Sequence, residues 1–100
     1  MNKELIVNAL HEIQTDSQEF RKTHDLLAMY NKYGIFFLGE DLNTILSNEL
    51  ITILQKHFQI SFDPEELIKD LPNLCSDLNI TCEPVAELFG NTFTSYQLYF

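Results

Sequence analysis

Residues 63–79 have the sequence DPEELIKDLPNLCSDLN, which contains the strongest local structural signal in the chain. Asp63 suits the N-cap of a helix, and Pro64 suits the first helical position, where its missing N–H would have no partner anyway. Apolar residues then recur at helical spacing, namely Leu67, Ile68, Leu71, Leu74, Cys75 and Leu78. We therefore predict a helix that starts at Pro64, ends at Asn79 and is kinked or split at the internal Pro72.

The segment before this helix has the longest apolar periodicity in the chain. Its apolar residues lie at i, i+3, i+4 and i+7 spacing: Leu42, Ile45, Leu46, Leu50, Ile53, Leu54 and Phe58. The pattern predicts another helix, with Asp41 as its N-cap. Ser47 and Asn48 are weak helix formers, so this helix either continues through them or breaks there and starts again.

A wholly apolar run, residues 35–38, lies between Gly34 and Gly39. The run is too short for a helix, and its β-branched and aromatic side chains favour a strand that is buried on both faces. Gly34 can adopt the left-handed conformation that closes a helix. We therefore expect a helix to end at Gly34 and a strand to follow it.

Two amphipathic helices are predicted before Gly34. The first has an apolar side formed by Leu5, Ile6, Ala9, Leu10 and Ile13. It is expected to break at residues 14–17, where Asp16 and Glu19 have the spacing of a capping box. The second helix has an apolar stripe of Phe20, Leu27 and Tyr30.

The C-terminal third is rich in strand-forming residues. Residues 80–85 predict a strand that Pro84 confines to a sheet edge, because proline cannot donate to a ladder. Gly90 and Asn91 mark a turn, and Thr, Phe and Tyr predict a last strand over residues 92–100. These two strands would form a hairpin with its loop at residues 86–91.

The predicted class is therefore α+β, in one domain of residues 1–100, with about four helices and a small antiparallel sheet in the order H-H-E-H-H-E-E. If the first two helices are merged, this order resembles that of a winged-helix domain. The resemblance implies that the strand at residues 35–38 pairs with the C-terminal hairpin in a three-stranded sheet. It also implies that residues 59–62 form the turn before the helix from Pro64, which would occupy the DNA-recognition position.

Composition limits the classes of partner. The 100 residues carry a net charge of −9, and residues 34–100 have ten acids against two bases, Lys56 and Lys69. Such a surface repels phosphate backbones and anionic lipids, so we expect neither direct nucleic-acid binding nor membrane binding. The charge either keeps the protein in solution or docks on a basic partner. Without a long apolar segment or a signal-peptide pattern, the expected location is the cytoplasm.

No motif in the sequence indicates catalysis, a metal site or a cofactor. Cys75 and Cys82 do not form a close zinc-binding pair, and both are expected to be small buried hydrophobic residues, although the sequence leaves open whether they are free thiols. The acids around Asp63 are explained by the positive end of a helix dipole. The histidines fall in three different predicted helices: His11, His24 and His57. We therefore expect a protein that is not an enzyme and holds no cofactor.

The remaining functional class is a protein-interaction module, such as a small regulatory, inhibitory or adaptor protein of a bacterium or phage. The alternative is a transcription-associated winged-helix protein that contacts DNA through its N-terminal helices. The first candidate surface is the acidic start of the helix from Pro64, formed by Asp63, Glu65, Glu66 and Asp70. The expected partner is a protein with a basic surface.

The second candidate surface is the aromatic C-terminal strand, with Tyr96, Tyr99 and Phe100. One face of this strand can pack on the helices, while aromatic residues on the other face would form an interaction hot spot. An exposed edge of the same strand would also allow the protein to form a homodimer by pairing with a copy of itself.

Overall fold

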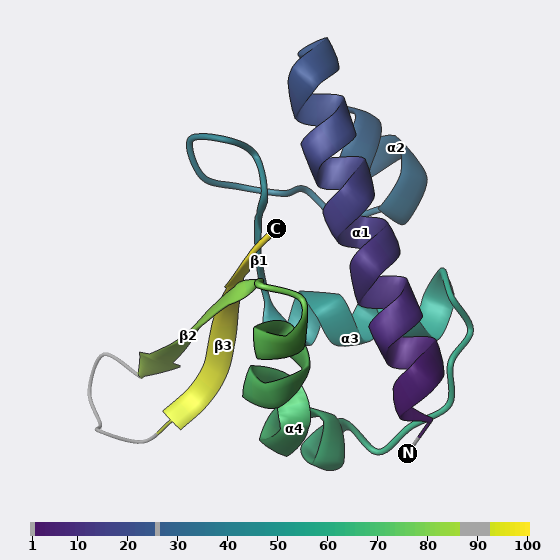
Figure 1. Ribbon diagram of the computed structural model, residues 1–100, viewed down its shortest axis with the longest axis vertical. Coiled ribbons are helices and arrows are strands. Elements are labelled where there is room, and N and C mark those ends of the chain that lie inside the picture. Colours follow the sequence, from purple (N-terminus) through teal and green to yellow (C-terminus); the bar gives the residue numbers. More distant parts are fainter. Residues whose placement is uncertain (1, 26, 87–92) are drawn as a thin grey trace.

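The computed structural model describes the chain except for residues 1, 26 and 87–92 (Figure 1). Within the described residues the helices are α1 (Lys3–Thr23), α2 (Ala28–Tyr33), α3 (Ser47–Lys56) and α4 (Pro64–Asp77). The strands are β1 (Thr44–Leu46), β2 (Thr81–Ala86) and β3 (Phe93–Tyr99). The predicted α+β class and the order H-H-E-H-H-E-E are confirmed.

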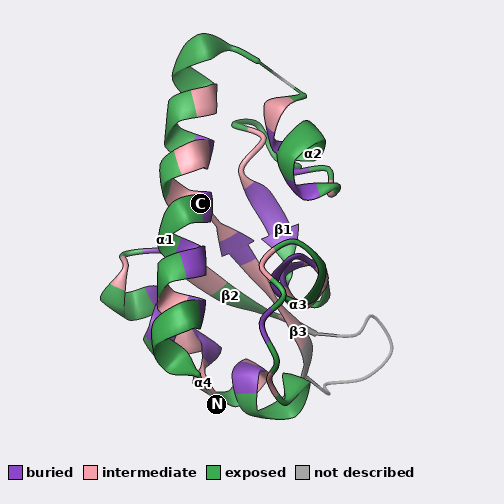
Figure 2. Ribbon diagram, turned by 90° about the vertical axis from the view of Figure 1, so that its right-hand side faces the viewer, coloured by how far each residue is buried: buried purple, intermediate pink, exposed green. Residues whose placement is uncertain are grey.

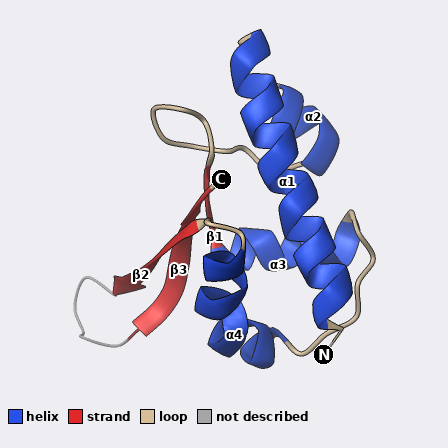
Figure 3. Cartoon of the chain, viewed as in Figure 1, coloured by secondary structure: helices blue, strands red, loops and turns tan. Residues whose placement is uncertain are grey.

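The three strands form an antiparallel sheet in the order β1-β3-β2, which lies to one side of the helices (Figure 3). Leu98 of β3 pairs with both Ile45 of β1 and Cys82 of β2. Pro84 lies in β2, an outer strand, as its missing N–H predicted. The turn predicted at Gly90 and Asn91 lies outside the described residues.

The first helix is longer than predicted. α1 continues without a break through residues 14–17, so the predicted end of the helix there is wrong. The Asp16 side chain does not cap a helix, because its Oδ2 accepts hydrogen bonds from the Tyr33 hydroxyl and the Lys32 ammonium. Ser17 faces the interior. Thr15, Asp16 and Ser17 have low helix propensities, but the free energy gained by burying one face of α1 is larger than this local cost, so the helix continues through them.

The second predicted helix is divided differently. Phe20 belongs to α1, which ends at Thr23 with His24 in the left-handed conformation at φ 56°. α2 then begins at Ala28 as a short helix. Gly34 closes α2 with a φ of 74°, and its N–H donates to the Tyr30 carbonyl, which confirms this predicted helix end.

The strand predicted at residues 35–38 is wrong, and so is the helix predicted from Asp41. Leu38 makes only an isolated bridge with Thr44, and residues 39–42 turn between them. The edge strand is β1 instead, where Ile45 is buried opposite Leu98. α3 starts at Ser47, which confirms the alternative of a second start at that point, and the Glu49 side chain accepts from the Leu46 N–H.

The helix from Pro64 is the best predicted element. Asp63 Oδ1 accepts from the Glu65 N–H at 3.0 Å, so the predicted N-cap is confirmed. α4 passes Pro72 without being split, because its buried side chains hold both halves against the core. It ends at Asp77, and Asn79 has the left-handed φ of 57° that turns the chain toward β2.

The core lies between the sheet and the inner sides of α1, α3 and α4 (Figure 2). Each of these elements contributes fully buried aliphatic residues, among them Ile6, Leu10, Ile13, Leu50, Leu54, Leu67, Leu71 and Leu98. Burial of each such side chain contributes about 1.5–3 kcal/mol. The outer side of α4 is therefore free to carry polar residues without cost to the core.

Candidate functional site

The start of α4 presents carboxylates to solvent. Asp63, Glu65 and Glu66 are exposed, and the acids in the first turn complement the positive end of the helix dipole. Further along the helix, Asp70 and Asp77 are accompanied by Lys69 as the one basic residue of α4. The exposed acids of α4 are therefore concentrated at its start, with half-buried Asp70 and exposed Asp77 further along.

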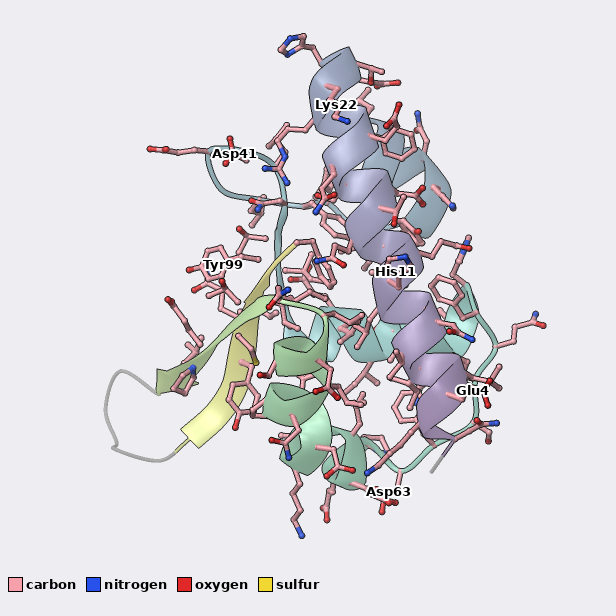
Figure 4. All side chains as sticks on the ribbon, viewed as in Figure 1. Glu4, His11, Lys22, Asp41, Asp63 and Tyr99 are labelled. Carbon is pink, nitrogen blue, oxygen red and sulfur yellow. The ribbon has the colours of Figure 1, made fainter. Side chains whose placement is uncertain are left out.

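A groove lies between α4 and the N-terminal half of α1. It has a volume of about 380 Å³ and is lined by residues of both helices, including Glu4, Val7, Asp70, Leu74 and Asp77. Lys3 Nζ lies 3.6 Å from Asp70 Oδ2 across it. Figure 4 shows Glu4 of α1 and Asp63, the N-cap of α4, toward the same end of the molecule.

This α1–α4 groove combines two kinds of surface. Glu4, Asp70 and Asp77 supply three carboxylates against one base, Lys3, and Val7 and Leu74 add apolar surface. A lysine or arginine side chain matches both, because it buries an aliphatic stem on apolar surface and places its charge on a carboxylate. The acids of α4 were predicted from the sequence, whereas the contribution of α1 was not, since only the tertiary structure brings Glu4 beside them.

The aromatic residues of the C-terminal strand do not share one face. Phe100 is buried and packs on Phe37, with ring centroids 6.1 Å apart. Tyr96 is half-buried, and its backbone N–H donates to Ser47 Oγ. Tyr99 points away from the core, and its hydroxyl donates to Glu83 at 3.3 Å. Figure 4 places Tyr99 far from Asp63, so the two surfaces predicted from the sequence are separate.

β3 is the central strand of the sheet, with β1 on one side and β2 on the other. A strand from a second molecule would have to add beside β1 or β2. Pro84 has no backbone N–H, so the outer strand β2 has one hydrogen-bond donor fewer for pairing with another strand. Pairing through the edge of β2 would therefore have fewer backbone hydrogen bonds than pairing through a strand without proline.

The two cysteines are both free thiols. Cys75 is buried on α4, and Cys82 is half-buried on β2. Burial, and then the neighbouring Cys82, raise the pKa of Cys75 to about 12, so this thiol is protonated and weakly nucleophilic at neutral pH. His57 contacts the Tyr33 and Phe58 rings. No cluster of three metal-ligating side chains occurs among the described residues.

A smaller pocket, of about 210 Å³, lies beside the C-terminal half of α1. The Ser17 hydroxyl at this pocket is buried and has no hydrogen-bond partner in the described part of the chain. Arg21 also lines the pocket and lies 3.9 Å from Asp41. Charges of both signs line this pocket, Arg21 together with Asp25, Glu40 and Asp41, and it offers less volume than the α1–α4 groove.

The sequence prediction missed one exposed apolar surface. Residues 35–38 were expected to be buried on both faces, but Phe36 and Leu38 are exposed while Phe37 between them is buried. Phe36 stacks on the exposed Tyr30 of α2. No change in polarity along this run distinguishes its inner from its outer residues, so no pattern in the run predicts which side chains are exposed.

Comparison with protein-family models, with curated proteins and with solved structures finds no match to this chain. None of the helices in the described part of the chain is both long enough and apolar enough to cross a membrane. Any assignment of function therefore depends on the geometry and charge of the chain itself.

Proposed function

We propose that this chain is a non-enzymatic protein-interaction module, a small cytoplasmic regulatory, inhibitory or adaptor protein of a bacterium or phage. It binds a basic segment of a partner protein in the α1–α4 groove and on the adjoining start of α4. The observation that supports this most directly is the lining of the groove, in which three carboxylates, Glu4, Asp70 and Asp77, outnumber the single base Lys3 and lie with apolar Val7 and Leu74.

The position of α4 in the fold strengthens the proposal. In a winged-helix arrangement the second helix of the pair meets DNA, and such a helix needs Lys and Arg to neutralise phosphates and to read guanine. α4 has acidic residues at its start, including Glu65 and Glu66 in its first turn. A helix in this position with acidic side chains is suited to bind a basic protein surface, and its carboxylates could take the place of DNA phosphates on such a surface.

The test begins with the partner. Tagged protein is used to capture partners from lysate of the source organism, with and without nuclease, and a protein retained after nuclease treatment is purified for binding measurements. The variant Asp70→Lys/Asp77→Lys then reverses the groove charge. Reversal at Glu65 and Glu66 would also weaken the start of α4, whereas Asp77 is the last residue of α4, where Lys is favourable. Asp70→Lys also removes the ion pair with Lys3, so circular dichroism checks that the variant is folded.

We expect the double reversal to weaken partner binding by roughly tenfold or more and to reduce its dependence on salt. The matched control is Glu19→Lys/Glu40→Lys, which changes the net charge equally at two exposed sites outside the groove. If both variants bind as the wild-type protein does, the groove is not the binding site. If both lose binding equally, only the net charge matters and the groove proposal fails.

One observation favours a second candidate, a winged-helix protein that contacts DNA through its N-terminal helices. Arg21 and Lys22 line an open hollow of about 690 Å³ together with Thr81 and Tyr99. Titration of labelled duplex DNA at low salt tests this candidate. Tight binding that the variant Arg21→Ala/Lys22→Ala abolishes would favour DNA over a protein partner.

A further inference from the structure

Four large apolar side chains between the N-cap of α2 and the turn before β1 are exposed. Leu27 is 54% exposed, Tyr30 41%, Phe36 57% and Leu38 61%. The Tyr30 and Phe36 rings stack with centroids 4.2 Å apart and planes 13° from parallel. We call these four residues the α2 patch. Clustered apolar surface of this kind on a small protein marks an interaction site, and exposed aromatic residues dominate the binding energy of such sites.

The backbone holds the α2 patch in place. Leu27 and Tyr30 are three residues apart at the start of α2, so they share one side of the helix. Phe36 and Leu38 are two residues apart on either side of Phe37, whose buried ring lies near those of Tyr33 and Phe100. Tyr33 in turn donates a hydrogen bond to Asp16 of α1. The patch is thus fixed from beneath, which lowers the entropy lost on binding.

Charges of both signs lie beside α2. Lys32 of α2 has its Nζ 3.4 Å from Glu12 Oε2 and 2.5 Å from Asp16 Oδ2 of α1, so this base is neutralised locally, and the four side chains of the patch are themselves uncharged. An interface between two identical copies related by a twofold axis must be complementary to itself. The acidic α4 surface would repel its own copy, whereas a neutral apolar patch with both signs of charge around it would not.

We propose that the α2 patch is the interface of a symmetric homodimer, in which the patch of one copy packs on that of a second copy. α2 and α4 lie toward different ends of the molecule in two perpendicular views (Figures 1 and 2). The dimer therefore leaves both α1–α4 grooves exposed and separates the two acidic ends. This proposal is independent of the function proposed for the groove, although a dimer would present that groove twice.

The test is the mass of the purified full chain in solution. Sedimentation equilibrium over roughly 1–100 μM protein is expected to give twice the monomer mass at the upper concentrations. The variant Phe36→Ser/Leu38→Ser is expected to raise the dimer dissociation constant by roughly tenfold or more. The matched control is Leu5→Ser, since Leu5 is similarly exposed, at 48%, but lies on α1 outside the patch. Circular dichroism checks that each variant is folded.

A wild-type protein that stays monomeric over this whole range overturns the proposal, and the patch would then serve a different protein. A dimer that Phe36→Ser/Leu38→Ser leaves intact overturns it as well. Weakening of the dimer by Leu5→Ser as strongly as by the patch variant would place the interface elsewhere. The groove variant Asp70→Lys/Asp77→Lys is expected to remain dimeric, so failure of the groove proposal and failure of this one give different results.

Discussion

Asp16 shows how a residue that suits a helix cap can have a different role in the folded protein. Its Oδ2 accepts from the Tyr33 hydroxyl at 2.6 Å and from the Lys32 ammonium at 2.5 Å. The Asp16 bond is the largest cause of the raised pKa of Lys32, and burial is the largest cause of the raised pKa of Tyr33. One carboxylate on α1 thus fixes α2 in position.

We predict that Asp16→Ala lowers the free energy of unfolding by about 1–3 kcal/mol, because it leaves the buried Tyr33 hydroxyl without its acceptor. Urea denaturation measures the change. The control is Glu19→Ala at an exposed position of the same helix, which should change stability by less than about 0.5 kcal/mol. If Tyr33→Phe costs as much in the Asp16→Ala background as in the wild type, the two residues are not coupled.

Cys75 gives the protein a dependence on alkaline pH. Burial raises the pKa of its thiol from 9.0 to about 12, so the folded state favours the protonated form. The stability that this contributes is fully present below the unfolded pKa near 9 and is lost as the pH rises toward 12.

We therefore expect the free energy of unfolding to fall between pH 9 and pH 11, and Cys75→Ala to reduce this slope by roughly 1 kcal/mol per pH unit. Urea titrations at several pH values measure it. Cys82→Ala serves as the comparison, because Cys82 is only half-buried and should change the slope less. Equal slopes in the wild type and in Cys75→Ala would show that other groups cause the alkaline loss.

At the scale of elements, the turn between α2 and β1 depends on its glycines in two different ways. Leu38 and Thr44 exchange both backbone hydrogen bonds across this turn. Gly39 has a φ of +90°, and a Cβ there would lie 2.8 Å from Thr44 Oγ1. Gly34 has a φ of +74°, but nothing lies within 4 Å of a Cβ at that position. Both positions favour glycine for their conformation, whereas only Gly39 also lacks space.

We predict that Gly34→Ala costs about 1–2 kcal/mol, the conformational penalty of the left-handed region. Gly39→Ala should cost clearly more, because the buried Thr44 cannot move away without disturbing β1. Chemical denaturation of the two variants side by side decides the question. Equal losses would mean that the turn relaxes around the added methyl group.

At the scale of the whole molecule, charge and apolar surface are separated along the chain. The α1–α4 groove and the α2 patch lie on different parts of the fold, one acidic and one neutral. β3 occupies the centre of the sheet, so the two edges of the sheet belong to β1 and β2.

Local signals in the sequence determined the elements whose ends they mark. Asp63 and Pro64 set the start of α4, Gly34 set the end of α2, and Pro84 set β2 at an edge, since each acts through its own backbone geometry or capping group. The class, the order of elements and the acidic side of α4 followed from such signals and from apolar periodicity.

The tertiary structure alone decided the rest. An apolar run such as residues 35–38 has no polar alternation, so only packing could choose Phe37 for the core and leave Phe36 and Leu38 outside. The apolar periodicity that starts at Leu42 predicted one helix, but Ile45 lies in β1 instead, buried opposite Leu98. Pairing with β3 therefore outweighed the local helical pattern at this position. Likewise, Glu4 joined Asp70 and Asp77 only because α1 and α4, far apart in sequence, pack together. A contact between two distant segments depends on how both of them pack in the fold, so the sequence of either segment alone does not predict it.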